Sequence, residues 1–180
     1  MLTAAAAEPD TLVVGVDANA AAMAEASRRA ARRPDRGGLA NALFVVAAAE
    51  ALPAGLDGLA DRVTVHFPWG SLLRGLLAAD PAVLGGLARV LRPGATLSML
   101  VSATDRDRSA RVTPIREPDL AALAGAYGRH GLELTGVRPA TAADVAASRS
   151  TWGRRLGAGA GRPAWLLRAE RAGAGRRQAR

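Results

Sequence analysis

The chain of 180 residues contains no cysteine, which excludes disulfide bonds and thiolate metal sites. Histidine is scarce, with His66 and His130 the only two, and we expect no metal site. No apolar run approaches the ~20 residues that span a bilayer. The first ten residues, MLTAAAAEPD, lack the basic segment of a signal peptide. We therefore expect a soluble, cytoplasmic protein.

Lysine is absent, and all 24 basic residues are arginine. Abundant alanine and glycine indicate GC-rich codon usage, so that one arginine alone says little about recognition. The distribution of charge says more. Residues 1–100 contain 9 arginines and 9 acids, whereas residues 101–180 contain 15 arginines and 7 acids. This asymmetry favours a basic surface that binds a polyanion, with a solvated basic tail as the alternative.

Aromatic residues are few: three Trp, two Phe and one Tyr. One of them, Trp69, stands between Pro68 and Gly70 at the end of a hydrophobic run. Proline ends a strand because it lacks an N–H, and glycine permits a sharp turn. A ring held there can stack on a base, which is worth ~1–3 kcal/mol. The alternative is that Trp69 packs against the next helix.

Strand-like and helix-like segments alternate along the whole chain. This alternation predicts an α/β fold with an open, mostly parallel sheet covered by helices on both faces. We expect one domain over residues 1–171 and a disordered basic tail over 172–180. Val63, Val65 and Phe67 are expected on one face of their strand. The predicted strands are 11–19, 42–50, 61–68, 132–140 and 163–171, together with one within 92–103 that follows a turn at Arg92-Pro93-Gly94. The predicted helices are 20–33, 71–77, 81–91, 117–131 and 140–152.

Ligands of such sheets bind beyond the carboxyl ends of the strands. Asp17 ends the first predicted strand, where its carboxylate could accept bonds from both ribose hydroxyls of a nucleoside cofactor; a helix N-cap is the alternative. Ala49 and Glu50 follow the second strand, where a loop would pass near the adenine. An ordinary surface turn is the alternative there.

A second notable stretch is STWGRRLG, residues 150–157. Trp152 is followed by Arg154 and Arg155, and Arg162 lies further along. Tryptophan beside paired arginines suits an unstacked base and a nucleic-acid backbone. The alternative is that Trp152 covers the sheet.

Five motifs occur in order along the chain: LVVGVDAN, AAAEALP, FPWGSLLRG, RVLRPGA and STWGRRL. Together they resemble the aminoglycoside-resistance 16S rRNA adenine-N1 methyltransferases of the kanamycin–apramycin type, over roughly residues 8–170. The resemblance implies a Rossmann-like class I methyltransferase that uses S-adenosylmethionine. Its implied reaction is methylation of N1 of adenine 1408 in the 16S rRNA of the 30S subunit, which confers aminoglycoside resistance. We expect a monomer.

The resemblance also implies roles for individual residues. Trp69 and Trp152 would sandwich a flipped adenine, and no general base is needed because N1 carries a lone pair. Arg154, Arg155 and Arg162 would grip the rRNA backbone. The implied cofactor-binding residues are Asp17, Ala49, Glu50, Thr64, Val65, His66, Phe67, Pro68, Trp69, Ser150, Thr151 and Trp152.

One part of the class I pattern is missing, because no strand with a Gly-rich loop precedes LVVGVDAN. That strand would lie centrally, between the strands of Asp17 and Trp69, so both would lose a neighbour. We expect either a start site upstream of Met1 or a degenerate gene, and weak cofactor binding by these residues alone. The alternatives for function are a non-catalytic rRNA-binding relative, a small-molecule methyltransferase and a nicotinamide-binding protein.

Overall fold

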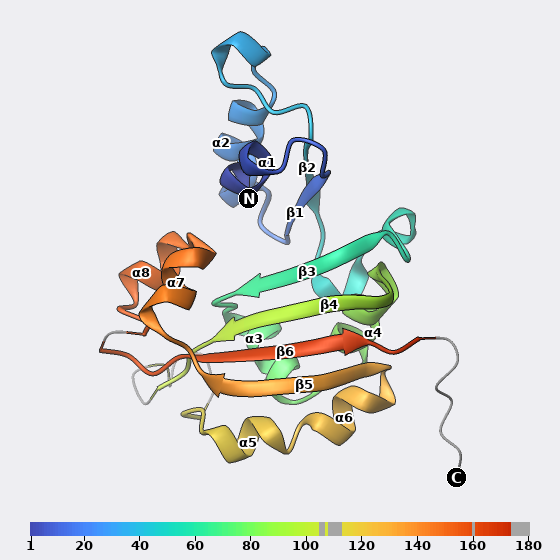
Figure 1. Cartoon of the computed structure of the whole chain (residues 1–180), viewed down its shortest axis with the longest axis vertical. Helices are drawn as coiled ribbons and strands as arrows, with labels where there is room; N and C mark the ends of the chain where they lie inside the picture. The colour runs from blue at the N-terminus through green and yellow to red at the C-terminus, as the bar shows by residue number, and fades with distance from the viewer. Residues whose placement is uncertain (105–106, 108–112, 160, 174–180) are drawn as a thin grey trace. The chain divides into compact units, whose positions relative to one another are not determined.

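The computed structural model describes residues 1–104, 107, 113–159 and 161–173. Most of the predicted tail, residues 174–180, lies outside the described residues. Helices and strands alternate as the sequence predicts (Figure 1). No single described helix is long and apolar enough to cross a membrane; the pair Gly70–Leu77 and Pro81–Val90 passes that test only together and is bent by 92°.

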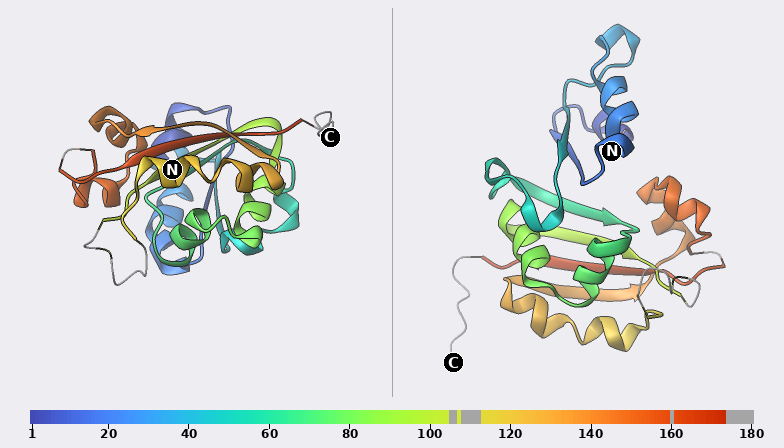
Figure 2. Two further views of the ribbon diagram at one scale, coloured as in Figure 1. Left: turned by 90° about the horizontal axis from the view of Figure 1, so that it is seen from below. Right: turned by 180° about the vertical axis from the view of Figure 1, so that it is seen from behind.

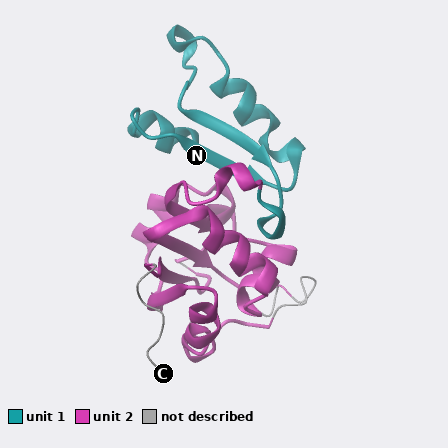
Figure 3. Cartoon of the chain, turned by 90° about the vertical axis from the view of Figure 1, so that its right-hand side faces the viewer, with its two compact units in different colours: residues 1–52 teal, residues 53–180 magenta. Residues whose placement is uncertain are grey.

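The chain divides into two compact units, residues 1–52 and the residues from 53 onward (Figure 3). The elements of the first unit are α1 (Leu2–Ala7), β1 (Val13–Asp17), α2 (Ala20–Ala30), η1 (Pro34–Arg36), β2 (Ala42–Val46) and η2 (Ala49–Ala51). Those of the second are η3 (Ala54–Leu56), β3 (Ala60–His66), α3 (Gly70–Leu77), α4 (Pro81–Val90), β4 (Leu91–Val101), α5 (Glu117–Ala121), α6 (Ala124–Arg129), β5 (Leu132–Pro139), α7 (Ala142–Ser148), α8 (Thr151–Arg155) and β6 (Trp165–Arg171).

In the first unit, β1 and β2 form a parallel pair with Asp17 opposite Val46. Asn41 immediately precedes β2, and its side-chain amide N–H groups donate to three carbonyl oxygens of α1 and the loop that follows it, at 2.9–3.0 Å. The side-chain amide of Asn41 thus joins the amino-terminal helix to the strand pair.

In the second unit, four strands lie in the order β3-β4-β6-β5. β3 and β4 are parallel, whereas β6 is antiparallel to both β4 and β5. The expected mostly parallel sheet is therefore modified by one reversed strand. Among the described residues, β1 pairs with β2 alone and β3 with β4 alone, in two separate sheets.

The two faces of the four-stranded sheet differ in polarity. Helices α3 and α4 lie against one face, and α5 and α6 run along β5 (Figures 1 and 2). Tyr127 of α6 joins this core, where its hydroxyl donates to the Leu76 carbonyl at 3.1 Å and burial raises the pKa of the phenol. The largest buried side chains of the core include Leu73, Leu76, Leu84, Leu97, Met99, Leu120, Leu132 and Leu167.

The opposite face carries polar side chains at alternate positions. Thr64, Ser98 and Arg168 are register partners across β3, β4 and β6. Thr64 and Arg168 are exposed, and Ser98 is half-buried. In the second unit, α3 and α4 therefore lie against one face of the sheet. The opposite face is polar at these positions and is covered at one end, where Leu100 and Leu166 pack with Val145 of α7. The alternation of polar and apolar residues in β3 and β4 explains the difference.

Two predicted helices are each divided. The segment 117–131 forms α5 and α6, and the segment 140–152 forms α7 and the start of α8. The second break is at Arg149, whose φ of 51° is left-handed. The predicted turn Arg92-Pro93-Gly94 lies inside β4, where Gly94 has a φ of 77°.

Candidate functional site

The carboxyl end of β3 makes a sharp corner at Phe67, whose φ is 51°. A positive φ is uncommon for a bulky residue. The Phe67 N–H donates to the Leu100 carbonyl at 2.7 Å, which holds this conformation. The corner reverses the alternation of side chains expected from Val63 and Val65. Phe67 is 4% exposed and packs in a cluster with Leu100 and Leu166, so its predicted place beside Val63 and Val65 is wrong.

This corner presents Trp69 at the surface. Pro68 is buried, and Trp69 occupies the N-cap position of α3 with extended backbone (φ −132°, ψ 165°). Gly70 follows with a φ of 60°, which allows the chain to enter the helix. The Trp69 side chain is 42% exposed. It is therefore not sealed beneath the helix that it begins.

The second tryptophan belongs to the α7–α8 arm, which we define as residues 140–159. The arm leaves β5 where the Ala140 N–H donates to the Ala164 carbonyl at 2.8 Å. α7 begins with a capping box between Thr141 and Asp144, and Arg138 binds the Asp144 carboxylate through two hydrogen bonds of 2.7 and 2.8 Å. The arm is thus tied to the end of β5 by a bidentate ion pair.

Ser150 is the N-cap of helix α8, and its hydroxyl accepts the Gly153 N–H at 3.0 Å. This cap directs the helix so that Trp152 is 44% exposed. The ring centroids of Trp69 and Trp152 are 6.4 Å apart with an interplanar angle of 73°. Two residues more than eighty positions apart in sequence therefore form one edge-to-face pair at the carboxyl end of β3.

The geometry of the pair has a chemical consequence. A base stacked between two rings needs near-parallel faces about 7 Å apart, twice the usual contact distance. The separation of 6.4 Å is close to that value, but the angle of 73° is not parallel. One indole must rotate before a purine fits between them.

Several other predicted residues belong to the two segments that carry the tryptophans. Thr64 and His66 are exposed on the polar face of β3, whereas Val65 is half-buried on the opposite face. Ser150 is half-buried as the cap of α8, and Thr151 is exposed beside Trp152. These segments thus present hydroxyl and imidazole groups as well as the two indoles. The side chain of Phe67 is buried, so only its backbone is available to a ligand.

The predicted phosphate-binding arginines separate into two groups. Arg154 and Arg155 are exposed in the last turn of α8. Arg162 is not: its side chain is 12% exposed, and it pairs with the Asp107 carboxylate, which is 5% exposed. Its Nε also donates to the Ser102 hydroxyl at 2.8 Å. The structure therefore makes Arg162 a structural cation that joins the segment after the arm to the segment after β4, and we withdraw it as a phosphate ligand.

In the first unit, Asp17 is exposed at the carboxyl end of β1. Its Oδ1 accepts the Asn19 N–H at 2.8 Å, and Asn19, not Asp17, caps α2. The alternative role predicted for Asp17, that of a helix N-cap, is therefore filled by Asn19. Ala49 and Glu50 lie in η2, after β2, at the same end of this parallel pair as Asp17. Ala49 is half-buried and Glu50 is exposed.

A basic cluster in the first unit escaped the sequence reasoning. It comprises five exposed arginines at the end of α2 and in η1: Arg28, Arg29, Arg32, Arg33 and Arg36. Acids elsewhere balance the net charge of residues 1–100 and conceal the cluster. Counting charge in short windows would have found it, because Asp35 is the one acid within residues 28–36.

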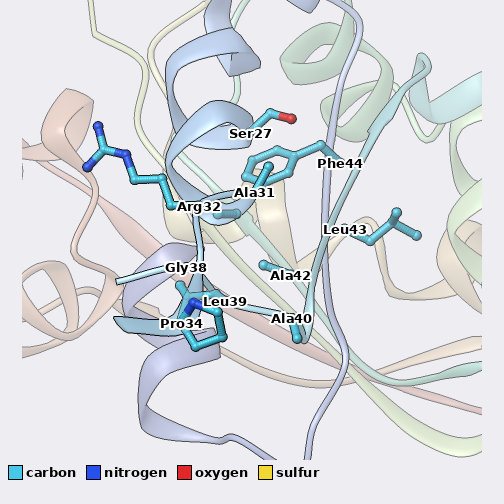
Figure 4. Close-up of a pocket in the computed structure, with 11 residues that line it drawn as sticks. Ser27, Ala31, Arg32, Pro34, Gly38, Leu39, Ala40, Ala42, Leu43 and Phe44 are labelled. Atoms are coloured by element: carbon cyan, nitrogen blue, oxygen red, sulfur yellow. The ribbon is translucent and has the colours of Figure 1, made fainter. Parts of the chain in front are cut away.

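The first unit also contains a pocket of about 420 Å³ between the end of α2 and the start of β2 (Figure 4). Its walls are mostly small and apolar, with Ser27, Leu39 and Phe44 among the lining residues and Arg32 the charged one. Asp17 lies at the opposite end of the strand pair. The pocket is therefore separate from the predicted cofactor residues.

The tie between Arg138 and Asp144 predicts a response to acid. Hydrogen bonds from Arg138, then from the Thr141 backbone and hydroxyl, lower the pKa of Asp144 well below its usual value. A lowered pKa stabilises the fold above the unfolded value of about 3.9, and this contribution falls as protons bind at lower pH. We expect the wild type to be more stable than Asp144→Asn at pH 7 and the difference to narrow progressively below about pH 4. Urea unfolding of both proteins across this range measures it; a constant difference would contradict the assignment.

Comparison of the sequence with known proteins identifies a family. The sequence model of the 16S rRNA (adenine(1408)-N(1))-methyltransferases, NpmA, matches residues 1–171. A methyltransferase of that name from Streptoalloteichus hindustanus is 39% identical over 153 residues, which cover 82% of this chain and 70% of the relative.

Solved structures give the same result. The 16S rRNA (adenine(1408)-N(1))-methyltransferase from Catenulisporales acidiphilia superposes with a TM-score of 0.84 at 35% identity, covering 96% of this chain and 82% of that one. A tryptophan-to-alanine mutant of that enzyme was solved with cosubstrate SAM. The antibiotic-resistance methyltransferase Kmr superposes with a TM-score of 0.78 at 39% identity, over 96% and 81% of the two chains. The chain therefore belongs to the 16S rRNA (adenine(1408)-N(1))-methyltransferase family.

Proposed function

We propose that this chain transfers a methyl group from S-adenosylmethionine to N1 of adenine 1408 in the 16S rRNA of the 30S subunit, and so confers aminoglycoside resistance. The observation that carries the proposal is the pair of exposed indoles, Trp69 and Trp152, at the carboxyl end of β3. Family membership supports the choice of substrate.

The chemistry requires positioning more than activation. S-adenosylmethionine supplies an activated methyl group on a sulfonium. N1 of adenine has a lone pair at neutral pH, so no side chain has to remove a proton. A base in a helix is paired or stacked, so the protein must extract it and hold it. Trp69 and Trp152 offer two aromatic faces for that purpose, and stacking contributes ~1–3 kcal/mol per base.

The donor set suits the cofactor. Asp17 is exposed, and a carboxylate can accept bonds from both hydroxyls of a ribose; we propose this role for it, with Ala49 and Glu50 beside the adenine. In the second unit we propose Thr64, Val65, His66, Pro68 and the Phe67 backbone, with Ser150 and Thr151, for the methionine end. Each assignment is made from the position of the residue at the carboxyl end of a strand or at the start of α8.

Two exposed basic surfaces support binding of RNA. Arg154 and Arg155 extend from α8 next to Trp152. The cluster of Arg28, Arg29 and their neighbours forms the other surface. Arginine binds phosphate through a bidentate fork, and such contacts position a protein on nucleic acid without reading its sequence. We propose that the chain binds as a monomer.

A methylation assay tests the proposal. Because we expect these residues alone to bind the cofactor weakly, the assay uses a saturating concentration of S-adenosylmethionine labelled in the methyl group. With 30S subunits that have adenine at position 1408, the purified chain should then yield labelled 16S rRNA. Primer extension should stop at that adenine. Subunits with guanine at that position serve as the control and should remain unlabelled. Binding of 30S particles without methyl transfer would contradict the proposal and indicate a non-catalytic relative.

A further inference from the structure

A close contact joins the two segments that carry the tryptophans. Gly153 of α8 lies against the ring of Phe67, so that a Cβ at residue 153 would be 2.3 Å from Cε2, 2.6 Å from Cδ2 and 3.0 Å from Cζ. Gly153 is buried. Every side chain other than hydrogen would therefore collide with the ring.

Both residues of this contact are near neighbours of the two tryptophans in the chain. Phe67 is two residues before Trp69, and Gly153 is the residue after Trp152. α8 therefore rests on the β3 corner directly beside the two indoles. The centroids of the two indole rings beside this contact are 6.4 Å apart.

Phe67 has little freedom to move aside. Its side chain is 4% exposed and belongs to a cluster that includes Val145, Ala158 and Ala164 of the arm and its exit. Its backbone has a φ of 51° and its N–H is bonded to Leu100. A densely packed interior transmits strain instead of absorbing it. A methyl group at residue 153 would therefore displace α8, not the ring.

We propose that Gly153 and Phe67 are positioning residues that set the separation of Trp69 and Trp152 for capture of the base. This inference rests on the proposed function and names a determinant of it. Neither residue has to contact the substrate; both act through the indoles. The glycine is required because only a residue without Cβ lets α8 approach the corner closely.

The test is Gly153→Ala, with Gly125→Ala as the matched control. Gly125 lies in helix α6, where a Cβ would meet nothing within 4 Å. To increase the distance between the added Cβ and Phe67 Cε2 from 2.3 Å to an ordinary 3.4 Å, α8 must move by about 1 Å. Misplacement of that size can reduce a rate by 10²-fold. We expect kcat/KM for 30S methylation to fall between about tenfold and 100-fold in Gly153→Ala and to stay at the wild-type value in Gly125→Ala.

A second variant separates positioning from misfolding. Phe67→Ala combined with Gly153→Ala removes the Cδ2, Cε2 and Cζ atoms that the added methyl group would meet. We expect this double variant to recover part of the activity that Gly153→Ala loses. Activity of the double variant at or below that of Gly153→Ala would overturn the proposal, as would wild-type activity in Gly153→Ala.

A spectroscopic readout needs no substrate. Two indoles in edge-to-face contact couple their excited states and give an exciton couplet in far-ultraviolet circular dichroism, which Trp69→Ala should abolish. We expect Gly153→Ala to weaken this couplet and Gly125→Ala to leave it intact. If the wild type does not methylate 30S subunits, the proposed function fails while the couplet still decides whether Gly153 sets the spacing. An unchanged couplet in Gly153→Ala would overturn the inference alone.

Discussion

Trp69→Ala is expected to lower kcat/KM for methylation of 30S subunits by about 100-fold. The substitution removes one of the two faces available to a flipped adenine, and stacking on one aromatic side chain is worth ~1–3 kcal/mol. Loss of alignment adds to this, because a base held on one side only is poorly oriented toward the methyl group. Initial rates of labelled methyl transfer at several 30S concentrations measure the change.

The fold should tolerate this substitution, since the Trp69 ring is 42% exposed. Trp69→Phe is the matched control, because it keeps an aromatic face and should retain most of the activity. Comparison of thermal unfolding across the three proteins excludes a loss of structure. If Trp69→Ala methylates 30S subunits at the wild-type rate, the two rings do not form the base clamp.

Asp107→Ala is expected to lower the free energy of unfolding by about 3 kcal/mol. The change leaves the Arg162 guanidinium, whose side chain is 12% exposed, without its carboxylate. Removal of one partner of a buried pair leaves an uncompensated charge, and this is the larger part of the loss. Asp107 also accepts the Thr104 N–H at 2.7 Å and its hydroxyl at 3.1 Å. Chemical denaturation at neutral pH measures the difference.

An exposed ion pair provides the control for this experiment. Asp119 pairs with Arg116 at 3.0 Å, with side chains 50% and 78% exposed. Asp119→Ala should therefore lower the free energy of unfolding by less than about 1 kcal/mol. The double variant Asp107→Leu with Arg162→Leu should recover much of the lost stability, because it removes both charges. Equal effects of Asp107→Ala and Asp119→Ala would show that the pair near Ser102 is not buried in solution.

The order and type of the elements follow from local patterns in the sequence. Asn19 and Asp80 cap α2 and α4, and the Gly-containing turns end helices near the expected residues. These signals depend on neighbours in the chain and are visible without the fold. The direction of β6 is different: its antiparallel pairing with β4 and β5 depends on partners more than twenty residues away. No periodicity within residues 165–171 encodes that direction.

Part of the candidate site was also predictable from local sequence patterns. Trp69 and Trp152 stood out because aromatic residues are rare and flanked here by turn-forming or basic residues. The place of Phe67 was not predictable in this way. Alternation along β3 predicts that its side chain lies on the same face as Val63 and Val65, but its positive φ turns the side chain to the opposite face. Arg162 was misjudged for a related reason: its partner Asp107 is far away in sequence. Charge composition identifies a basic segment, but it does not tell a buried cation from an exposed one.

The reversal of β6 makes the α7–α8 arm the loop of one large hairpin. Pro139 and Trp165 are direct neighbours across β5 and β6, so the arm leaves and re-enters the sheet within one strand spacing, ~4.8 Å. Loops with adjacent ends accept insertions and deletions at small entropic expense. Changes in the length of this one connection can therefore alter substrate preference, while the pairing of β5 with β6 stays in register.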